Sequence, residues 1–372
     1  MKDFNFMIPQ NIHFGVGALK KLPEILGQLN SDKVLLISDR GLEKIGVVKK
    51  IQDIIEAGGI TCTTFLDVVP NPTIPVVEAA AKLYKESGST SIVAVGGGSS
   101  MDVSKAVGVL SKHGGKITDY EGNHTVPGPI VPMLAIPTTA GTGSEVTASA
   151  VITDPERNFK FTVFSYENLP KYAILDPELI MTAPASIAAS CGVDALIHAM
   201  EAYISNLATP FSDAFAEKAM ELIGANLRKF VANRQDEEAA CAMMIGSTFA
   251  GISFAWARLG NVHAMSHPVS AYFNVPHGVA NSILLPNIME YNATADKGRY
   301  EVMYNYIHEG EKAENFDPMM LVEELRELNT ALKIPATLSE VGVTEDKIEA
   351  MAADAMKSGN IPANPRKTCV ED

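Results

Sequence analysis

The sequence predicts an α/β N-terminal nucleotide-binding domain followed by an all-α C-terminal domain. Three observations carry this prediction. Short apolar runs alternate with helical patterns in the first half, a glycine-rich turn follows one of these runs, and the second half carries long Ala- and Met-rich helical patterns. Continuous apolar strands separated by helices are typical of a parallel sheet that is covered on both faces. We place one division after residue 182, which gives predicted domains 1–182 and 183–372.

The expected elements of the first half alternate in type along the chain. Strands are expected at 34–38, 61–66 and 91–95, and helices at 46–57, 73–87 and 103–110. In the second half the apolar residues recur at helical spacing. Helices are expected there at 184–202, 210–231, 237–254, 318–332 and 344–356.

Composition excludes several classes of protein. The 372 residues include 30 Lys and Arg against 44 Asp and Glu, a net charge of −14, and an acidic surface repels nucleic acid and anionic membranes. The four cysteines form no CxxC pair, and neither a signal peptide nor a stretch of about 18 uninterrupted apolar residues is found. We therefore expect a cytoplasmic protein with a small-molecule partner, and neither a nucleic-acid nor a membrane partner.

The glycine-rich turn Gly96-Gly97-Gly98 follows an expected strand and precedes an expected helix. Glycines let a backbone approach a ligand closely, and the N–H groups at a helix start favour phosphate. The turn does not match G-x-G-x-x-G, so an ordinary tight turn remains an alternative.

Two further segments strengthen the nucleotide interpretation. Asp39 follows the strand at 34–38, where a carboxylate can accept hydrogen bonds from an adenosine ribose and repel a 2′-phosphate, which favours NAD over NADP. The segment 137–145 is rich in hydroxyl groups and glycines, and it can donate to phosphate or ribose. Together with the glycine turn, these segments predict a bound dinucleotide.

Histidines and one aspartate gather in apolar segments of the second half. Asp194 and His198 are four residues apart, His263 and His267 repeat this spacing, and His277 follows in a loop-like segment. On a helix this spacing places both side chains on one face. Each histidine alone could be a core residue that bonds to backbone, but the set is better explained by a shared divalent cation, Fe²⁺ or Zn²⁺. Spacing does not say which imidazole is spare.

At this point the chain resembles the iron-containing (group III) alcohol dehydrogenase family, from Phe14-Gly15 to Asn364-Pro365-Arg366. The motifs that carry the resemblance are Gly96-Gly97-Gly98-Ser99-Ser100-x-Asp102, Thr138-Thr139-Ala140-Gly141-Thr142-Gly143-Ser144-Glu145, Gly192-x-Asp194-Ala195-x-x-His198-Ala199-x-Glu201, His263-Ala264-Met265-x-His267-Pro268 and Pro276-His277-Gly278. The resemblance implies a dehydroquinate-synthase-like fold that is assembled as a homodimer or a larger homo-oligomer.

The resemblance also assigns roles to individual residues. It implies Asp194, His198, His263 and His277 as metal ligands, with His267 as the catalytic proton relay. The predicted cofactor-binding residues are Asp39, Asn71, Gly97, Gly98, Ser99, Asp102, Thr138, Thr139, Thr142, Ser144, Lys160 and Leu179. The implied cofactors are NAD(H) and Fe²⁺, with Zn²⁺ as an alternative metal.

The activity implied is the NAD(H)-dependent interconversion of a short-chain primary alcohol and its aldehyde. The metal would act as a Lewis acid, and the nicotinamide would carry the hydride. Two alternatives stay open. One is a lyase of the dehydroquinate-synthase kind, which consumes no net NADH, and the other is a non-catalytic binder of metal or nucleotide.

The predicted substrate region departs from the family pattern. Many relatives read Phe-Asn-Asn-Ala-Gly-Leu-Gly where this chain reads Phe254-Ala255-Trp256-Ala257-Arg258-Leu259-Gly260. We predict Phe254 and Arg258 as substrate residues. Arg258 either forms an internal salt bridge or holds a carboxylate, sulfonate or phosphonate on a short aldehyde by a forked hydrogen bond.

Overall fold

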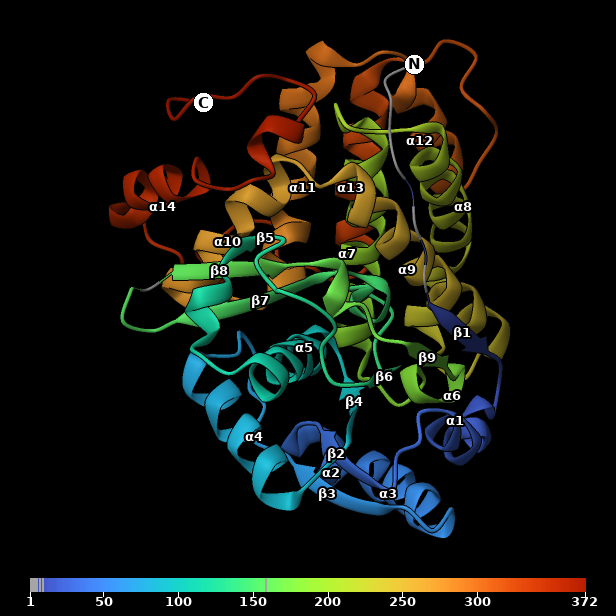
Figure 1. The fold of residues 1–372 in the computed structure, drawn as a ribbon. Helices are drawn as coiled ribbons and strands as arrows, with labels where there is room; N and C mark the ends of the chain where they lie inside the picture. Colours follow the sequence, from blue (N-terminus) through green and yellow to red (C-terminus); the bar gives the residue numbers. More distant parts are fainter. Residues whose placement is uncertain (1–5, 7, 9, 158) are drawn as a thin grey trace. The chain divides into compact units, whose positions relative to one another are not determined.

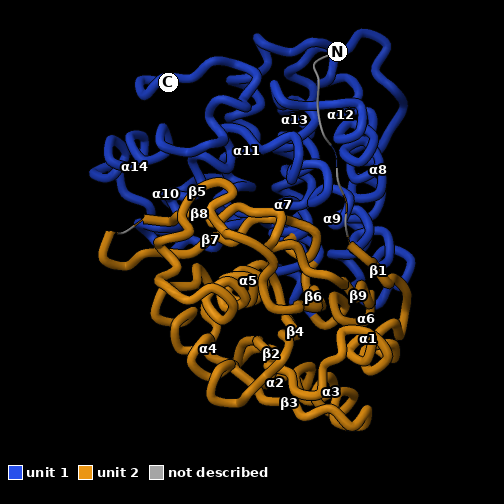
Figure 2. Tube along the Cα trace, in the orientation of Figure 1, with its two compact units in different colours: residues 1–7, 140–143, 183–372 blue, residues 8–139, 144–182 orange. Residues whose placement is uncertain are grey.

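The structure is a computed structural model that describes residues 6, 8, 10–157 and 159–372. The chain divides into two compact units (Figure 2). Unit 2 comprises Ile8–Thr139 and Ser144–Thr182, and unit 1 comprises Ala183–Asp372 with Phe6 and the short segment Ala140–Gly143. The segment Ala140–Gly143 lies within the sequence of unit 2 but groups with unit 1. A single division of the chain, as predicted from the sequence, does not include such a segment.

Unit 2 contains a six-stranded parallel sheet, as predicted (Figure 1). In spatial order its strands are β1 (Asn11–Phe14), β9 (Tyr172–Leu175), β6 (Met133–Pro137), β4 (Ser91–Gly96), β2 (Lys33–Ile37) and β3 (Thr61–Phe65). Successive residues of a strand enter different cores: Leu35 joins one hydrophobic cluster and Leu36 the other. Because both faces of the central strands β2, β4 and β6 are buried, these strands read as nearly uninterrupted apolar runs, whereas the edge strands β1 and β3 do not.

Helices supply the other half of each core. One cluster includes residues of α1 (Leu22–Gln28) and α3 (Val47–Ala57), and the other includes residues of α4 (Ile74–Ser87) and α5 (Gly98–His113). The expected helix at 103–110 therefore begins earlier, at Gly98, immediately after the glycine turn.

A second, three-stranded sheet was not predicted. It is ordered β5 (Gly122–Asn123), β8 (Phe159–Phe164) and β7 (Ser149–Asp154), and β7 and β8 pair antiparallel. Ile152, Phe161 and Val163 join the core cluster that contains α4 and α5.

Unit 1 is helical, as predicted, and its described residues contain no strand. Its helices are α7 (Ala185–Ile204), α8 (Pro210–Ala232), α9 (Glu237–Ala257), α10 (Asn261–Phe273), α11 (His277–Asn292), α12 (Arg299–Ile307), α13 (Pro318–Ala331) and α14 (Ile348–Ala355). His277 was expected in a loop, but it is the first residue of α11. By length and composition α7 and α9 could cross a membrane, but the apolar stretch of α7 is 89% buried, as in the core helix of a globular protein.

Candidate active site

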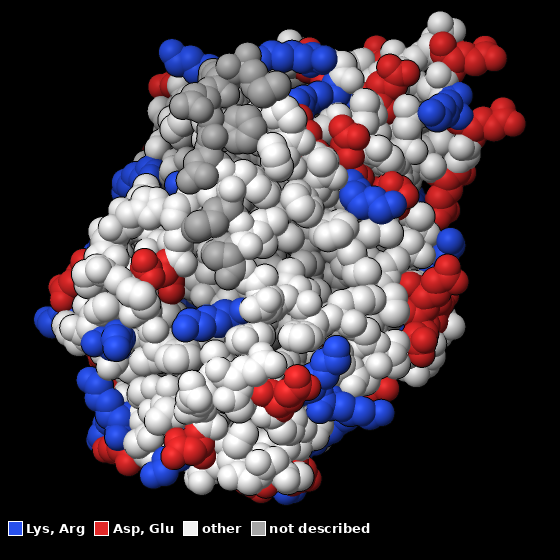
Figure 3. All heavy atoms as spheres, turned by 45° about the vertical axis from the view of Figure 1, so that its right-hand side comes forward, with Lys and Arg blue, Asp and Glu red and all other residues white. Residues whose placement is uncertain are grey.

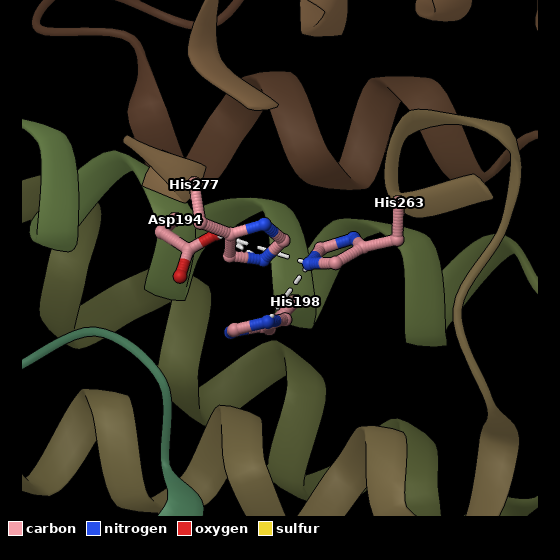
Figure 4. A group of neighbouring side chains, drawn as sticks. All are labelled: Asp194, His198, His263 and His277. Carbon is pink, nitrogen blue, oxygen red and sulfur yellow. Dashed lines mark hydrogen bonds and ion pairs between the residues drawn. The ribbon is translucent and has the colours of Figure 1, made fainter. Parts of the chain in front are cut away.

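Four side chains of unit 1 converge on one point (Figure 4). Asp194 and His198 come from α7, His263 from α10 and His277 from the start of α11. One nitrogen or oxygen atom of each lies within 4.8 Å of the corresponding atoms of the others. The first three side chains are buried, and the His277 side chain is 29% exposed.

The separations between these atoms fit a metal centre. Nε2 of His263 lies 3.0 Å from Nε2 of His198 and 3.8 Å from Oδ1 of Asp194, and Nε2 of His277 lies 3.9 Å from that same oxygen. Tetrahedral bonds of about 2.1 Å place ligand atoms roughly 3.4 Å apart. Three imidazoles and one carboxylate suit Fe²⁺ or Zn²⁺, so the donor set fits a divalent first-row metal.

The local sequence explains why these polar groups are buried together. From Ala188 to Ile204 nearly every residue of α7 is buried, so Asp194 and His198 enter the core one helical turn apart. Buried polar groups without partners are costly, and each of these finds its partners within the same cluster.

The outer nitrogens of two imidazoles have partners of their own. Nδ1 of His198 lies 3.2 Å from the carbonyl oxygen of Gly141, and Nδ1 of His263 lies 2.6 Å from Oε2 of Glu201. A proton on each Nδ1 leaves Nε2 with a lone pair that faces the centre of the cluster. Burial lowers the pKa of His263 to about 3, which keeps its imidazole neutral, as a metal ligand must be.

Asn281 also belongs to the cluster, although the sequence analysis did not single it out. This buried side chain lies four residues after His277 on α11, and its Nδ2 donates to Oδ1 of Asp194 at 2.6 Å. The same Nδ2 lies 3.0 Å from Nε2 of His263 and 3.1 Å from Nε2 of His277, while Oδ1 has no hydrogen-bond partner among the described residues. An i, i+4 search from His277 would have found it.

Two of the predicted relay and substrate residues, His267 and Phe254, lie beside the cluster. The ring of His267 is 5.5 Å from that of His277 and 6.2 Å from that of His263, and the four convergent side chains do not include it. The Phe254 ring lies 4.5 Å from that of His198. Arg258 ends α9 with a φ of 65°, a left-handed conformation that favours glycine.

In unit 2, five of the twelve predicted cofactor-binding residues directly follow the carboxyl ends of parallel strands. Asp39 follows β2, Gly97 and Gly98 follow β4, and Thr138 and Thr139 follow β6. The strand ends are tied together, because the Thr138 N–H donates to the Gly96 carbonyl at 3.1 Å. In open parallel sheets this edge is where nucleotides bind, and the N-terminus of α5 begins there at Gly98.

Other predicted cofactor-binding residues make contacts within unit 2. Nζ of Lys160, on β8, donates to Oδ1 of Asn71 at 2.6 Å, and burial lowers the pKa of Lys160 to about 8. Ser144 Oγ donates to Oδ1 of Asp102 at 3.2 Å, and burial raises the pKa of Asp102 to about 6. Leu179 is buried in the core beside α1 and α3.

The remaining predicted cofactor residues are Ser99 and Thr142. Ser99 lies in the first turn of α5, and Thr142 lies in the segment Ala140–Gly143 that groups with unit 1.

Lys105 is a buried cation that the sequence analysis did not identify. Its Nζ donates to the carbonyls of Ser144 and Ser149, each at 2.8 Å, and to the Thr147 hydroxyl at 3.1 Å. Burial lowers the pKa of Lys105 to about 8. These bonds fix the segment that follows the Thr- and Gly-rich loop. The sequence signal that could have identified Lys105 is a lysine among the apolar residues of the expected helix at 103–110.

The surface gives no sign of a nucleic-acid site on the side that Figure 3 shows. Lys and Arg side chains stand there singly or in small groups, interspersed with Asp and Glu. Nucleic-acid sites are built on extended basic surfaces, which this face lacks.

Comparisons with known proteins agree on one family. Residues 9–177 match the family described as iron-containing alcohol dehydrogenase, and residues 188–372 match the Fe-containing alcohol dehydrogenase family, C-terminal. The chain is 37% identical to the NAD-dependent methanol dehydrogenase of Bacillus methanolicus, over 99% of this chain and 97% of that protein.

Two solved structures extend the comparison. 1,3-propanediol oxidoreductase has a TM-score of 0.95 and 37% identity, covering 100% of this chain and 97% of that one. Sulfoacetaldehyde reductase from Bifidobacterium kashiwanohense, in complex with NAD⁺, has a TM-score of 0.88 and 29% identity, covering 100% and 96%.

Proposed function

The chain belongs to the iron-containing alcohol dehydrogenase family, and we propose that it interconverts a short-chain primary alcohol and its aldehyde with NAD(H) and a divalent metal. The observation that carries this proposal is the convergence of Asp194, His198, His263 and His277 on one buried point. The relatives support the reaction class, since they include an NAD-dependent methanol dehydrogenase and a sulfoacetaldehyde reductase.

In this proposal those four residues hold Fe²⁺, and Zn²⁺ is the alternative. When bound, the metal supplies Lewis-acid stabilisation of negative charge on the substrate oxygen, and NAD(H) supplies or accepts the hydride. Asp194 contributes the single negative charge of the ligand set. The Phe254 ring packs against that of His198, with 4.5 Å between the ring centroids.

His267 takes the role of proton relay. It lies one turn after His263 on α10, its ring is 5.5 Å from that of His277, and it is only partly buried. An imidazole outside the ligand set can hold the alcohol proton at a ring nitrogen and release it to solvent near neutral pH.

The cofactor is proposed to bind along the strand ends of unit 2. Asp39 accepts a hydrogen bond from the Leu42 N–H at 3.0 Å as the N-cap of α2 (Arg40–Lys44), which fixes its carboxylate beside β2. A carboxylate there favours the ribose of NAD over a 2′-phosphate. Gly97, Gly98 and Ser99 take the pyrophosphate at the start of α5, and the other predicted residues contact the rest of the cofactor.

Reduction of short aldehydes under anaerobic conditions tests this function. The Fe²⁺-loaded protein is expected to oxidise NADH in step with added propanal or a similar aldehyde, and to reduce NAD⁺ with the matching alcohol. A lyase of the dehydroquinate-synthase kind or a non-catalytic binder would bind NAD and metal without net NADH oxidation. If NADH absorbance does not fall with any aldehyde of a short-chain panel, the proposal is contradicted.

An anionic aldehyde is a second, narrower candidate for the substrate. Arg258 has a φ of 65° and a ψ of 179°, a backbone conformation that costs a non-glycine residue about 1–3 kcal/mol, and it lies one turn after Phe254. The similarity to a sulfoacetaldehyde reductase favours an anion-binding role over an internal salt bridge.

Arg258→Gly tests this role without adding backbone strain. If Arg258 holds the anion, the variant should raise KM for sulfoacetaldehyde about 10- to 100-fold and leave KM for propanal nearly unchanged. Equal effects on both aldehydes would favour the salt bridge.

We further propose that the protein is a cytoplasmic homodimer or larger homo-oligomer. In support, β1 lies at the edge of the six-stranded sheet, and it exposes Ile12 (37%) and Phe14 (42%). Light scattering of the purified protein would test this.

A further inference from the structure

We propose that Glu201 is a positioning residue of the metal centre, whose carboxylate fixes the start of α10 and the ring of His263 together. Its side chain is buried, and it lies three residues after His198 on α7. The proposal rests on the proposed function, because it presumes that the cluster binds a metal. Glu201 is the last residue of the motif that begins at Gly192 and contains Asp194 and His198, and the proposal gives it a role.

The two carboxylate oxygens of Glu201 reach two different groups of one helix. Oε2 lies 2.6 Å from Nδ1 of His263, and Oε1 accepts a hydrogen bond of 2.8 Å from the Val262 N–H. One side chain on α7 therefore sets both the position of the α10 backbone and the rotation of the imidazole that α10 carries.

The start of α10 depends on this external partner. A helix leaves its first N–H groups without partners inside the helix, and the N-cap of α10 is Gly260, which has no side chain to offer. The Asn261 N–H donates to Oδ1 of Asn364 at 3.2 Å, and the Val262 N–H donates to Glu201. Burial raises the pKa of Glu201 to about 7, and the N–H groups at this positive helix end act against that rise because they favour the carboxylate.

The fit around the carboxylate is close. A Cβ atom on Gly260 would lie 3.0 Å from Oε1 of Glu201 and 2.9 Å from Oδ1 of Asn364. Oδ1 of Asn364 also accepts from Nδ2 of Asn292, at 3.0 Å. A side chain at position 260 would therefore displace this carboxylate, so the close approach of the Gly260 backbone depends on glycine.

The consequence for His263 is a single usable tautomer. A carboxylate accepts the proton of Nδ1, so Nε2 keeps its lone pair and faces Nε2 of His198 at 3.0 Å. In Glu201→Gln the amide can still accept from Val262, but its NH₂ group then faces Nδ1–H. In that orientation the ring loses that bond or moves its proton to Nε2, where the proton blocks metal binding. In the reverse orientation the NH₂ group faces the Val262 N–H and the start of α10 loses its acceptor, so the amide cannot satisfy both donors.

Unit 1 contains a control of the same kind, the pair formed by buried Glu324 and half-buried His308. Oε2 of Glu324 lies 2.7 Å from Nδ1 of His308, and Oε1 accepts from Arg228 at 2.7 Å. His308 is not one of the four convergent side chains. Glu324→Gln therefore removes a carboxylate–imidazole bond of the same kind without touching the proposed ligands.

The test measures Zn²⁺ affinity of the full-length protein by competition with a chromophoric chelator. Loss of an outer partner of a ligating histidine typically weakens metal binding about 10- to 100-fold. We expect Glu201→Gln to raise the Kd for Zn²⁺ by that factor and Glu324→Gln to change it less than about twofold. Equal Kd values for Glu201→Gln and the wild-type protein would overturn the proposal, as would an equal loss in Glu324→Gln.

Asp194→Asn separates failure of this inference from failure of the proposed function. If Asp194→Asn binds Zn²⁺ as tightly as the wild-type protein, the cluster is not the metal site and the proposed function fails. If Asp194→Asn loses affinity and Glu201→Gln does not, only the role of Glu201 fails.

A measurement on the zinc-loaded wild-type protein covers the case in which Glu201→Gln does not fold. A downfield histidine Nδ1 proton is expected by NMR from each of the two carboxylate–imidazole pairs. Glu324→Gln should remove one of them and leave that of His263. Absence of the His263 proton would overturn the proposal.

Discussion

The two candidate sites are built in different ways. The metal cluster of unit 1 consists of side chains that three helices carry into a buried interior. The predicted cofactor site of unit 2 consists mainly of turns at the ends of parallel strands, where glycines and backbone N–H groups dominate. The first site depends on which side-chain atoms can bind a metal. The second depends on room for the cofactor beside the backbone and on the backbone conformation.

This difference predicts how each site tolerates substitution. In unit 1 an isosteric change of one ligand removes a donor atom that nothing else replaces. In unit 2 the same kind of change leaves the backbone donors in place, so losses should be smaller and should arise from charge or crowding. The predictions below run from the largest expected effect to the smallest.

The largest effect is expected for Asp194→Asn, which preserves shape but removes the only anionic ligand. Lewis-acid stabilisation is worth several kcal/mol, so kcat/KM for aldehyde reduction should fall by at least about 100-fold. Metal analysis should find well under one Fe²⁺ per chain. Asp213→Asn, which removes the partner of Arg299 in the same unit, should keep its metal. Full metal content and activity in Asp194→Asn would contradict the ligand assignment.

The next effect tests the charge at the end of β2. Serine is a good N-cap, so Asp39→Ser keeps the bond from the Leu42 N–H that begins α2 while it removes the carboxylate. Losing a hydrogen bond to a charged acceptor should raise KM for NADH about 10- to 100-fold. The variant should also accept NADPH better than the wild-type protein does. Steady-state kinetics with both cofactors checks this. An unchanged preference for NADH over NADPH would contradict the assignment of Asp39 to the cofactor site.

A smaller effect, seen in stability, tests the glycine turn. Gly96 has a φ of +143°, and a Cβ atom there would lie 2.4 Å from Oγ of Ser100. Gly96→Ala should therefore lower the free energy of unfolding by about 1–3 kcal/mol, as judged by urea unfolding. Gly128→Ala is the control, because a Cβ atom on Gly128 would meet nothing within 4 Å. Equal losses in both variants would show that crowding at the turn is not the cause.

The smallest effect is a pH dependence that arises from Asp102. Burial raises its pKa from 3.8 to about 6, so between these values the folded protein binds more protons than the unfolded chain. The contribution of Asp102 to stability is thus present at pH 4 and declines as pH rises to 6, by on the order of 1 kcal/mol. Urea unfolding in the presence of a chelator should show this decline in the wild-type protein. A decline of the same size in Asp102→Asn would assign it to another group.

Side-chain spacing on helices predicted only part of the cluster, and the family resemblance implied the full set of four side chains. Asp194 and His198 are one turn apart, which places both on one face of α7 wherever that helix packs. The parallel sheet was predictable because strands buried on both faces, such as β2 and β4, must be apolar throughout.

The partners of these groups were not predictable, because they come from distant parts of the chain. Glu201 and His263 are 62 residues apart, and Lys105 and Ser144 are 39 apart. No local pattern joins such pairs, and only the packing of helices and loops brings them together. The sheet of β5, β7 and β8 was missed for another reason. Two-residue β5 has no periodicity to detect, but β7 buries every second residue, and the sequence analysis did not use this alternation.

The central claim is that one divalent metal binds Asp194, His198, His263 and His277. Anomalous scattering at the iron edge, from crystals of protein loaded with Fe²⁺ without oxygen, tests it most directly. The account predicts one strong peak per chain, bonded to the Asp194 carboxylate and to Nε2 of the three histidines. A crystal of loaded protein with no peak at this point, or with its peak at other side chains, would contradict it.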